Sequence, residues 1–533
     1  MTSSPSLARS RPNLSRTAAA RGGTIPLRHA TKSAPSAYQT IASTRPPRVT
    51  AHPALLWFRD DLRLSDNPAL RAALDHGPLI CLYILDTATQ RRELGGAARW
   101  WLSRSLQALS QAIAAKGGEL LILRGDPAEL LPDIVERTGS SYVAWNRRYD
   151  GAAIALDRAL KAKLTETGVE VESFNANLLN EPWQVKTKAD GPFKVFTPYW
   201  RAVREGGEPS APLPAPARLS KATLPAALRK QALTIADLAL QPTAPDWASG
   251  LRDAWMPGED GAQDRLGTFL DEGIAGYREG RDRPDKLSTS RLSPHLRFGE
   301  ISPRQIWHAT RGALETGETP GSAADIEKFF SEIGWREFSY HLLFHNPDLA
   351  SVNYDRRFDA MAWATDEAGL KAWRKGLTGY PIVDAGLREL WQTGWMHNRV
   401  RMITASFLIK HLLTDWRAGE TWFWDTLVDA DPANNPASWQ WVAGSGADAA
   451  PYFRIFNPVT QGEKFDPKGD YVRRFVPELA KLGDRFIHRP WDAPASELKQ
   501  AGIVLGQNYP KPVVALDFGR RRALDAFAAL RSE

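Results

Sequence analysis

Short apolar runs alternate with helix-like segments over the first third of the chain. The runs are ALLWF (54–58), LICLYIL (79–85), ELLILRG (119–125), SYVAW (141–145) and VEVESF (169–174). Longer stretches with helical spacing of apolar residues, such as 99–117 and 152–168, separate the runs. Strands that alternate with helices predict the α/β class, a doubly wound parallel sheet that binds ligands beyond the carboxyl ends of its strands.

The pattern changes after residue 183. Residues 184–250 are rich in proline and alanine and have weak periodicity, which predicts a long connector between domains. Helical spacing then dominates, for example in AADIEKFFSEIGWREFSYHLLF (323–344) and WMHNRVRMITASFLIKHLL (395–413). We therefore expect an α/β domain over residues 51–183, the connector, an all-α domain over 251–515 and a C-terminal tail over 516–533.

The first 50 residues differ from the rest of the chain. They contain eight Lys or Arg, no acidic residue and little apolar pattern, which predicts a disordered basic tail. An organelle transit peptide has the same composition, so targeting stays an alternative. The whole chain has a formal charge of +7, so the 483 residues that follow this +8 tail sum to about −1. Binding of nucleic acid would therefore need a local basic patch.

Composition excludes several classes of protein. No apolar run approaches the roughly 18 residues that a membrane-spanning helix needs. The single cysteine, Cys81, excludes an intrachain disulfide and any zinc or iron–sulfur site built from several cysteines. We therefore expect a cytoplasmic protein in a reducing compartment, with no metal and no membrane contact.

Tryptophan is the outlier of the composition, because ten of the 20 tryptophans lie between residues 335 and 441. A tryptophan-rich core is one interpretation, since an indole buries a large area. The segment DADPANNPASWQW (429–441) also places two carboxylates and three amides beside two of these rings. This mixture is untypical of a plain core segment or a plain surface loop, and it indicates a functional site.

The predicted helix 396–412 has two unlike faces. At 100° per residue, Asn398, Arg401 and Met402 lie on one face, and the opposite face is mainly apolar. An amphipathic helix with its polar face in water is the alternative, but Met402 argues against it. The pattern favours a half-buried pocket that holds a flat ligand with polar groups.

Two further segments fit such a ligand. Glu332, Trp335 and Arg336 stand at i, i+3 and i+4 of another predicted helix, so they share a face. They could hold a stacked aromatic ligand, although a salt bridge beside a buried tryptophan gives the same pattern. The hydroxyl-rich segment TSRLS (289–293) precedes a helix-like stretch and suits a phosphate, although capping serines do the same.

Several motifs together resemble the photolyase/cryptochrome flavoprotein family over about residues 53–515. They are WFRDDLRLSDNPAL (57–70), TSRLSPHLRFGEIS (289–302), WREF (335–338), TGYPIVDAGLREL (378–390), NRVRMITASFLIKHLLTDWR (398–417) and the segment 429–441. Leu387 departs from the methionine that is usual in the family, and the change is conservative.

The resemblance implies a noncovalent, reduced FAD in the helical domain. By motif position, Tyr277, Thr289, Ser290, Arg291, Leu292 and Ser293 should hold its diphosphate region. Arg401, Asp429 and Asp431 should contact the isoalloxazine, and Asn435 should lie at the flavin N5. Phe329, Glu332, Arg336 and Asn398 complete the implied cofactor site.

The resemblance also implies light-driven repair of UV-damaged DNA, in which the reduced flavin donates an electron to a cyclobutane pyrimidine dimer and splits it. Glu332, Trp335, Asn398, Met402 and Trp441 should contact the flipped lesion, beside Arg336. Arg399 and Arg454 should contact DNA phosphates. Trp439, Trp416 and Trp363 should carry electrons between the flavin and the surface.

Residue types within the family favour the cyclobutane-dimer enzymes, with bacterial class III the nearest group. Asn435 matches repair enzymes, whereas cryptochrome photoreceptors usually carry Asp or Cys there. Met402 matches dimer photolyases, and the histidine pair of eukaryotic (6-4) photolyases is missing. A blue-light photoreceptor and a (6-4) photolyase remain the alternatives.

An antenna chromophore is implied for the α/β domain. The subfamily suggests methenyltetrahydrofolate, with a deazaflavin as the second choice. Trp145, Arg148, Tyr149 and Asp150 follow a predicted strand and are the candidates for its neighbourhood. We expect the protein to act on DNA as a monomer.

Overall fold

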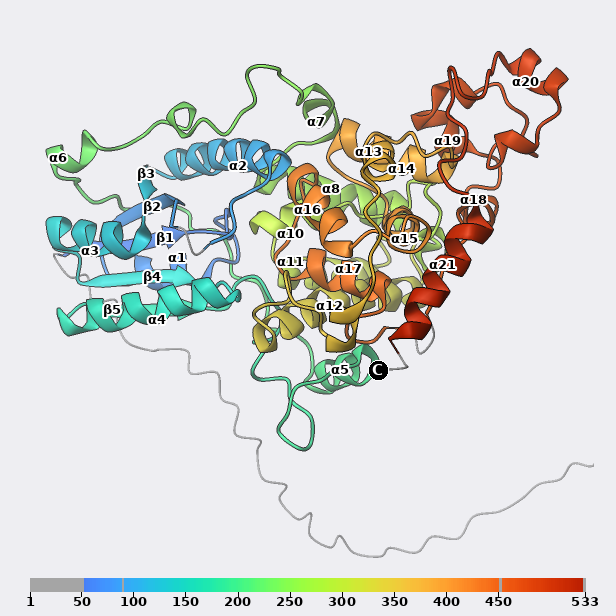
Figure 1. The fold of residues 1–533 in the computed structure, drawn as a ribbon. Coiled ribbons are helices and arrows are strands. Elements are labelled where there is room, and N and C mark those ends of the chain that lie inside the picture. The colour runs from blue at the N-terminus through green and yellow to red at the C-terminus, as the bar shows by residue number, and fades with distance from the viewer. Residues whose placement is uncertain (1–51, 89–90, 450–452, 531–533) are drawn as a thin grey trace, which may run out of the picture. The chain divides into compact units, whose positions relative to one another are not determined.

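The α/β part is built on a five-stranded parallel sheet in the order β3-β2-β1-β4-β5 (Figure 1). The strands are β1 (Ala54–Phe58), β2 (Leu79–Asp86), β3 (Leu120–Gly125), β4 (Tyr142–Asn146) and β5 (Glu170–Phe174). All five predicted runs form strands, and the predicted α/β class is confirmed. This computed structural model describes residues 52–88, 91–449 and 453–530, so the predicted tail over residues 1–50 lies outside the described residues.

Helices cover both faces of the sheet. They are α1 (Pro68–Leu74), α2 (Gly96–Ala115), α3 (Pro127–Thr138) and α4 (Gly151–Glu166). Successive side chains of a strand point to opposite faces, so the sheet has two separate apolar clusters. Leu56 packs on the side of α1 and α2, and Leu55 packs on the side of α3 and α4.

The connector runs back along the α/β part (Figure 1). Its short helices are α5 (Phe196–Glu205), α6 (Ala226–Arg229), η1 (Ala236–Leu238) and α7 (Ser249–Ala254). Leu219 joins the apolar cluster on the α2 side of the sheet, and Leu228 joins the cluster on the α3 side. The connector is therefore part of the packing of the α/β part, despite its weak periodicity.

The rest of the chain is helical. In order it contains α8 (Glu259–Thr268), η2 (Phe269–Gly273), α9 (Tyr277–Gly280), α10 (Ser293–Phe298), α11 (Pro303–Thr316), α12 (Ala323–His345), η3 (Arg356–Ala360), α13 (Glu367–Arg374), α14 (Pro381–Thr393), α15 (Asn398–Ser406), η4 (Phe407–His411), α16 (Trp416–Thr426), α17 (Asn434–Ala443), α18 (Pro458–Phe465), α19 (Asp470–Phe475), η5 (Pro477–Leu479), η6 (Pro490–Asp492), α20 (Ala495–Ala501) and α21 (Leu516–Ala529). The predicted all-α class of this part is confirmed.

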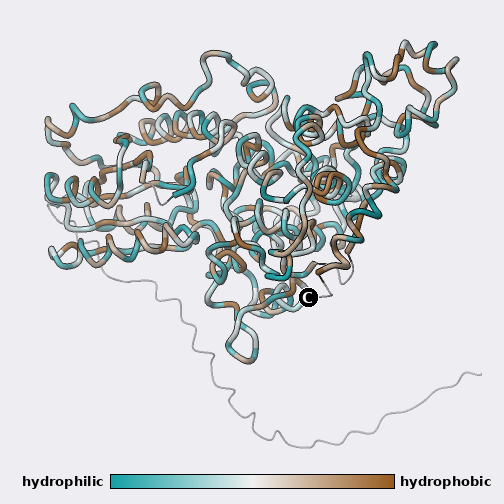
Figure 2. Tube along the Cα trace, viewed as in Figure 1, coloured by the Kyte–Doolittle hydropathy of each residue, from teal (hydrophilic) through white to brown (hydrophobic). Residues whose placement is uncertain are grey.

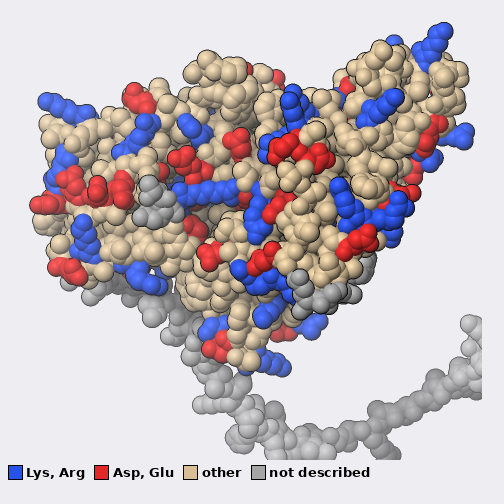
Figure 3. Space-filling view, in the orientation of Figure 1, with Lys and Arg blue, Asp and Glu red and all other residues tan. Residues whose placement is uncertain are grey.

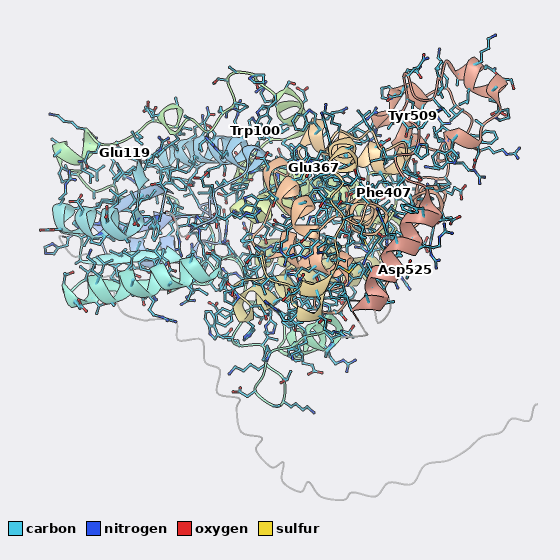
Figure 4. The ribbon with its side chains drawn as sticks, viewed as in Figure 1. Trp100, Glu119, Glu367, Phe407, Tyr509 and Asp525 are labelled. Carbon is cyan, nitrogen blue, oxygen red and sulfur yellow. The ribbon has the colours of Figure 1, made fainter. Side chains whose placement is uncertain are left out.

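Two helical features differ from the pattern that the sequence predicted. The single helix expected over 396–412 is α15 followed by the π-helical turn η4. The helix at the place of the α15 label of Figure 1 is coloured largely brown, for hydrophobic, in Figure 2. The segment expected as a tail contains α21, which packs against η4. Phe407 of η4 and Tyr509 belong to one apolar cluster (Figure 4). Asp525, also labelled in Figure 4, marks the position of α21.

Buried polar groups join the α/β part to the helical part. Arg63, after β1, donates from Nη1 to the carbonyl oxygen of Gly299 at 2.8 Å. The fully buried carboxylate of Asp66 accepts from Ser302 Oγ at 2.5 Å and from Arg304 Nε and Nη2, both at 3.0 Å. Gly299 has φ +64°, and a Cβ there would lie 2.1 Å from the carbonyl oxygen of Asp60. These contacts fix where α10 and α11 begin relative to the sheet.

The Asp66 link allows a test of this interface. Asp66→Asn keeps the side-chain shape but removes the charge that Arg304 and Ser302 meet. Breaking a buried ion pair on one side should lower the free energy of unfolding by about 3 kcal/mol. Urea unfolding measures this change. Asp246→Ala is the control, because Asp246 forms an exposed pair with Arg252 and should change the stability little.

Candidate active site

A cavity of about 500 Å³ lies in the helical part. Side chains from α9, α10, α12, α15, α16 and α17 contribute to its lining, which includes most of the predicted site residues. These are Tyr277, Ser290, Leu292, Ser293, Phe329, Glu332, Trp335, Arg336, Asn398, Arg399, Arg401, Met402, Asp429, Asp431, Asn435, Trp439 and Trp441. Segments that lie up to 164 residues apart in the chain therefore meet at one place.

Helix α12 presents Glu332, Trp335 and Arg336 to the cavity, as their spacing predicted. Glu332 pairs with Arg281 Nη2 at 2.7 Å and with Lys328 Nζ at 2.8 Å. The half-buried indole of Trp335 stacks on Phe196 of α5, with ring centroids 3.8 Å apart at 11°. A carboxylate and an indole thus stand side by side on a rigid helix.

Arg336 is the side chain of this face that reaches toward the α/β part. Its Nη1 donates to the carbonyl oxygen of Asn177 at 2.7 Å, and its guanidinium lies over the Tyr340 ring at 5.0 Å. Ser322 begins α12 with a capping box, in which its side chain and that of Asp325 each accept a backbone N–H of the other residue. The cap fixes the start of the helix that carries the three residues.

Helix α15 supplies a guanidinium that faces a buried carboxylate. Arg401 donates from Nη2 to Asp429 Oδ2 at 2.8 Å and from Nε to the carbonyl oxygen of Met396 at 2.8 Å. The other carboxylate oxygen, Asp429 Oδ1, is buried and has no hydrogen-bond partner among the described residues. Buried polar atoms normally have a partner, so Asp429 Oδ1 is available to a ligand N–H.

The first turn of α15 is held by a neutral histidine. The Nδ1 atom of His397 accepts the backbone N–H of Arg399 at 3.2 Å. Burial lowers the pKa of His397 to about 3, although Asp282 opposes this shift. His397 is therefore uncharged at neutral pH and can accept this hydrogen bond, which fixes the direction in which Asn398 and Met402 face the cavity.

Asp431 organises the start of α17. Its Oδ1 accepts the backbone N–H groups of Ala433 at 2.8 Å and Asn434 at 2.7 Å, and its Oδ2 accepts Tyr340 Oη–H at 2.7 Å. One turn on, Asn435 Nδ2 donates to Glu420 Oε1 at 2.8 Å. Asp431 therefore stabilises local backbone, and the amide of Asn435 is held at the cavity wall.

The three predicted electron-transfer tryptophans belong to one apolar cluster. Trp439 and Trp416 are buried, and Trp363 is half-buried. A Cβ added at Gly419 would lie 2.1 Å from the Trp439 ring, so α16 packs closely against this indole. Trp439 lines the cavity, Trp416 is buried and Trp363 is partly exposed, and their role in electron transfer stays a prediction.

Thr289, Arg291 and Arg454 do not line the cavity, although Thr289 and Arg291 flank Ser290, which does. Arg291 has φ +52°, and its guanidinium lies 4.5 Å from the Trp255 ring and 4.8 Å from the Trp395 ring. These cation–π contacts support the loop that presents Ser290. Arg454 is exposed.

The four candidate antenna residues lie at the carboxyl end of β4, with Trp145 in the strand and the other three after it, and each has a protein partner. The indole N–H of Trp145 donates to Asp157 at 2.8 Å, and Asp150 caps α4. Tyr149 Oη donates to Asn175 at 3.3 Å. Arg148 Nε donates to Asp60 Oδ2 at 2.8 Å.

Asp60 gathers three guanidinium groups at this edge of the sheet. Burial alone would raise the pKa of Asp60, but Arg148, Arg297 and Arg91 hold it well below its usual range. Arg297 also lines the cavity and donates to the carbonyl oxygen of Ala430 at 2.7 Å. Positive charge at the carboxyl ends of the strands thus extends to the wall of the cavity.

Sequence reasoning missed Arg281, Lys328 and Glu420, which bond to predicted residues. Lys328 precedes Glu332 by four residues in α12, so its helical spacing was a usable signal. Arg281 and Glu420 come from other segments of the chain, and no local pattern connects them to their partners. Among the described residues, no group of three or more His, Cys, Asp or Glu side chains is placed to hold a metal ion.

Comparisons with known proteins agree with this geometry. The family described as "DNA photolyase" matches residues 54–217, and the one described as "FAD binding domain of DNA photolyase" matches residues 329–529. A deoxyribodipyrimidine photo-lyase of Agrobacterium fabrum is 55% identical over 480 residues, which cover 90% of this chain and 98% of that protein. The chain belongs to the photolyase/cryptochrome family.

A cryptochrome and a photolyase of known structure are also similar to this chain. Cryptochrome-1 of Arabidopsis thaliana is 39% identical over 485 residues, which cover 90% of this chain and 70% of that protein. The crystal structure of a bacterial class III photolyase from Agrobacterium tumefaciens superposes with a TM-score of 0.87 at 53% identity. The match covers 93% of this chain and 100% of that one.

None of the described helices combines the length and apolarity that crossing a bilayer requires.

The residues of the cavity fit the FAD that the matched domain binds. The cavity combines apolar and aromatic walls with a guanidinium, an amide and the unpartnered oxygen of Asp429. Ligand sites of flat, polar-edged molecules have this composition. FAD binding is therefore supported by the space in the cavity and by Asp429 Oδ1, which is held in place and lacks a partner among the described residues.

Glu337, next to Arg336 in α12, gives a pH test of how this site is assembled. Burial raises the pKa of Glu337 from its ordinary 4.5 to about 7, although Arg336 and the backbone N–H groups of Asn180 and Leu179 oppose the shift. Between these two pKa values the folded state keeps a proton that the unfolded state has lost. The free energy of unfolding should therefore fall as pH rises, by about 1.4 kcal/mol per pH unit from this group.

Glu337→Gln should remove this contribution, because the glutamine oxygen still accepts the two backbone N–H groups but does not titrate. Urea unfolding of both proteins at several pH values between the two pKa values measures the difference in slope. Equal slopes for the two proteins would contradict the prediction.

Proposed function

We propose that this protein is a light-driven DNA repair enzyme that splits cyclobutane pyrimidine dimers. One observation carries the proposal: the Arg401–Asp429 pair, the amide of Asn435 and the Met402 face of α15 line the same cavity. The relatives named deoxyribodipyrimidine photo-lyase support it, since the chain covers almost the whole of the first of them. The enzyme is a lyase of carbon–carbon bonds that acts on UV-damaged DNA.

One group of cavity residues holds the cofactor. The chemistry that bound, reduced FAD supplies is the light-driven donation of one electron to the dimer. Asp429 Oδ1 accepts an N–H of the ligand, and Arg401 holds this carboxylate in place. Asn435 would present its amide to the flavin N5, and Ser290 and Ser293, which line the same cavity, would hold the diphosphate.

A second group of cavity residues holds the substrate. A damaged base pair leaves the stack at lower cost than an intact one, which allows the dimer to enter a pocket. Trp335 and Trp441 provide apolar surface, and Asn398 and Met402 line the same cavity from α15. Glu332 bonds the edge of a base, which requires Arg281 and Lys328 to keep its carboxylate oriented.

Cations near the cavity contact the phosphates of the DNA. Arg399 and Lys328 line the cavity, and Arg281 stands beside them. Figure 3 shows acidic and basic side chains interspersed over one face of the molecule, in agreement with a nearly neutral body. Binding therefore depends on this local group, with Arg454 as a further phosphate contact.

An antenna chromophore supplies further light absorption. We place it at the carboxyl ends of the strands, near Arg148, Tyr149 and Asp150, with Trp145 behind them in the core. Methenyltetrahydrofolate is the proposed antenna, as the resemblance to class III photolyases implies, and a deazaflavin is the alternative. An absorption band separate from that of FAD, released on denaturation, identifies the antenna.

A blue-light photoreceptor is the second candidate, because Cryptochrome-1 of Arabidopsis thaliana also matches 90% of the chain. The amide at position 435 favours repair. A single assay separates the two functions: an oligonucleotide with a defined thymine dimer, incubated with the photoreduced protein in blue light or in darkness. Light-dependent restoration of thymines is the expected result, and its absence with fully reduced FAD would leave the photoreceptor or the (6-4) lesion.

Glu332→Ala should lower the repair yield by at least tenfold, with little change in FAD content, because Glu332 contacts substrate more than cofactor. The ratio of repaired dimers to absorbed photons measures the yield, and flavin absorbance measures the content. Glu327→Ala is the matched control, because Glu327 lies on the same helix but pairs with Arg204 outside the cavity. Equal loss of yield and FAD in Glu332→Ala would contradict this role.

Trp439→Phe should abolish photoreduction of bound FAD in a mild reductant but keep dimer repair after chemical reduction. Phenylalanine fills the space against Gly419 but is much harder to oxidise than an indole. Transient absorption and the dimer assay on dithionite-reduced protein separate the two effects. Loss of repair in the chemically reduced variant would contradict a role limited to electron supply.

A further inference from the structure

Residues 91–96, which lead into the first residue of α2 in the α/β part, dock on the α16 helix of the helical part. Arg92 donates from Nη1 and Nη2 to the two carboxylate oxygens of Glu420, at 2.7 and 2.8 Å. Its guanidinium also lies 4.1 Å from the Trp424 ring, whose indole N–H donates to the carbonyl oxygen of Glu93 at 2.7 Å. Arg92 is thus held in a fixed position by a bidentate ion pair and an aromatic face.

The same carboxylate fixes the amide of Asn435. Glu420 is 2% exposed, and its Oε1 and its backbone carbonyl oxygen both accept from Asn435 Nδ2, at 2.8 and 3.1 Å. An ionised carboxylate only accepts hydrogen bonds, so the NH₂ group of Asn435 has to face Glu420. The carbonyl oxygen Oδ1 of the amide is then left for a ligand in the cavity that Asn435 lines.

We propose that Arg92, from the α/β part, is a positioning residue for Asn435 and sets the hydrogen-bonding character of the amide toward the flavin. The inference rests on the proposed function, in which Asn435 meets the flavin N5. An oxygen at that place accepts a hydrogen bond from N5–H, which the reduced flavin has and the oxidised flavin lacks. Arg92 also neutralises the buried charge of Glu420, which would otherwise disfavour added negative charge on the flavin.

Both effects have the same sign. Without Arg92, the carboxylate of Glu420 is buried with no counter-charge, and the arrangement that orients the amide is weakened. Each effect destabilises the reduced flavin relative to the oxidised flavin. Arg92 therefore supports the reduced cofactor from a distance, although it does not line the cavity.

Arg92→Gln tests the proposal in the full-length protein with FAD bound. The midpoint potential of the flavin, measured by spectroelectrochemistry, should shift to a more negative value, and re-oxidation of the reduced flavin in air should become severalfold faster. FAD content and the far-UV circular dichroism should stay unchanged. Arg92→Lys keeps the charge but loses the bidentate geometry, so it should recover part of the shift.

Asp425→Ala is the matched control. Asp425 is exposed on α16, and its Oδ1 accepts the backbone N–H of Gly96 at 2.8 Å, so the variant disturbs the same docked segment without touching Glu420. Its potential should equal that of the unmodified protein. An equal shift in Asp425→Ala and Arg92→Gln would overturn the proposal, because docking alone would then explain the effect.

The double variant separates this proposal from the cofactor assignment. Asn435→Ala should shift the potential, and adding Arg92→Gln should change it by less than Arg92→Gln does alone, because coupled residues are not additive. If Asn435→Ala shifts the potential and Arg92→Gln does not, the role of Arg92 is refuted and the flavin site stands. If Asn435→Ala leaves the potential unchanged, the placement of Asn435 at the flavin is refuted, and the role of Arg92 is refuted with it.

Discussion

The carboxylate of Asp66 has no access to water, so its charge has to be met by groups of the protein itself. Those groups are Ser302 and Arg304, at the start of α11, and the backbone N–H of Leu213 in the connector. A buried carboxylate therefore makes three segments of the chain depend on one another. The same contact lies beside α10, which contributes Ser293 and Arg297 to the cavity. The position of the site thus depends on an interaction outside it.

The elements with a strong local signal could be predicted from the sequence. The five strands coincide with five short apolar runs, because buried strands of a parallel sheet are apolar on both faces. The turn η4 and helix α21 were not predicted as such. The π-helical turn has no spacing of its own in the sequence, and α21 becomes recognisable only through its contact with η4. Tertiary packing decides both.

In the site too, local sequence patterns predict some features and tertiary contacts decide the others. Helical periodicity determined that Glu332, Trp335 and Arg336 share a face, and the structure places all three at the cavity. Their partners could not be found in this way. Arg281 is 51 residues from Glu332, and Arg92 is 328 residues from Glu420, so no local pattern connects them. Residue type and spacing show which side chains can act, but only the folded chain shows which groups orient them.

The path of the connector has a consequence for the modular evolution of this family. Leu219 belongs to one apolar cluster of the sheet and Leu228 to the other, so residues 184–250 complete the packing of the α/β part on both faces. A chimera that joined a foreign α/β part to this helical part at residue 183 would leave both clusters incomplete. The block that recombination can move intact therefore extends to about residue 250, and it must bring a carboxylate to meet Arg304.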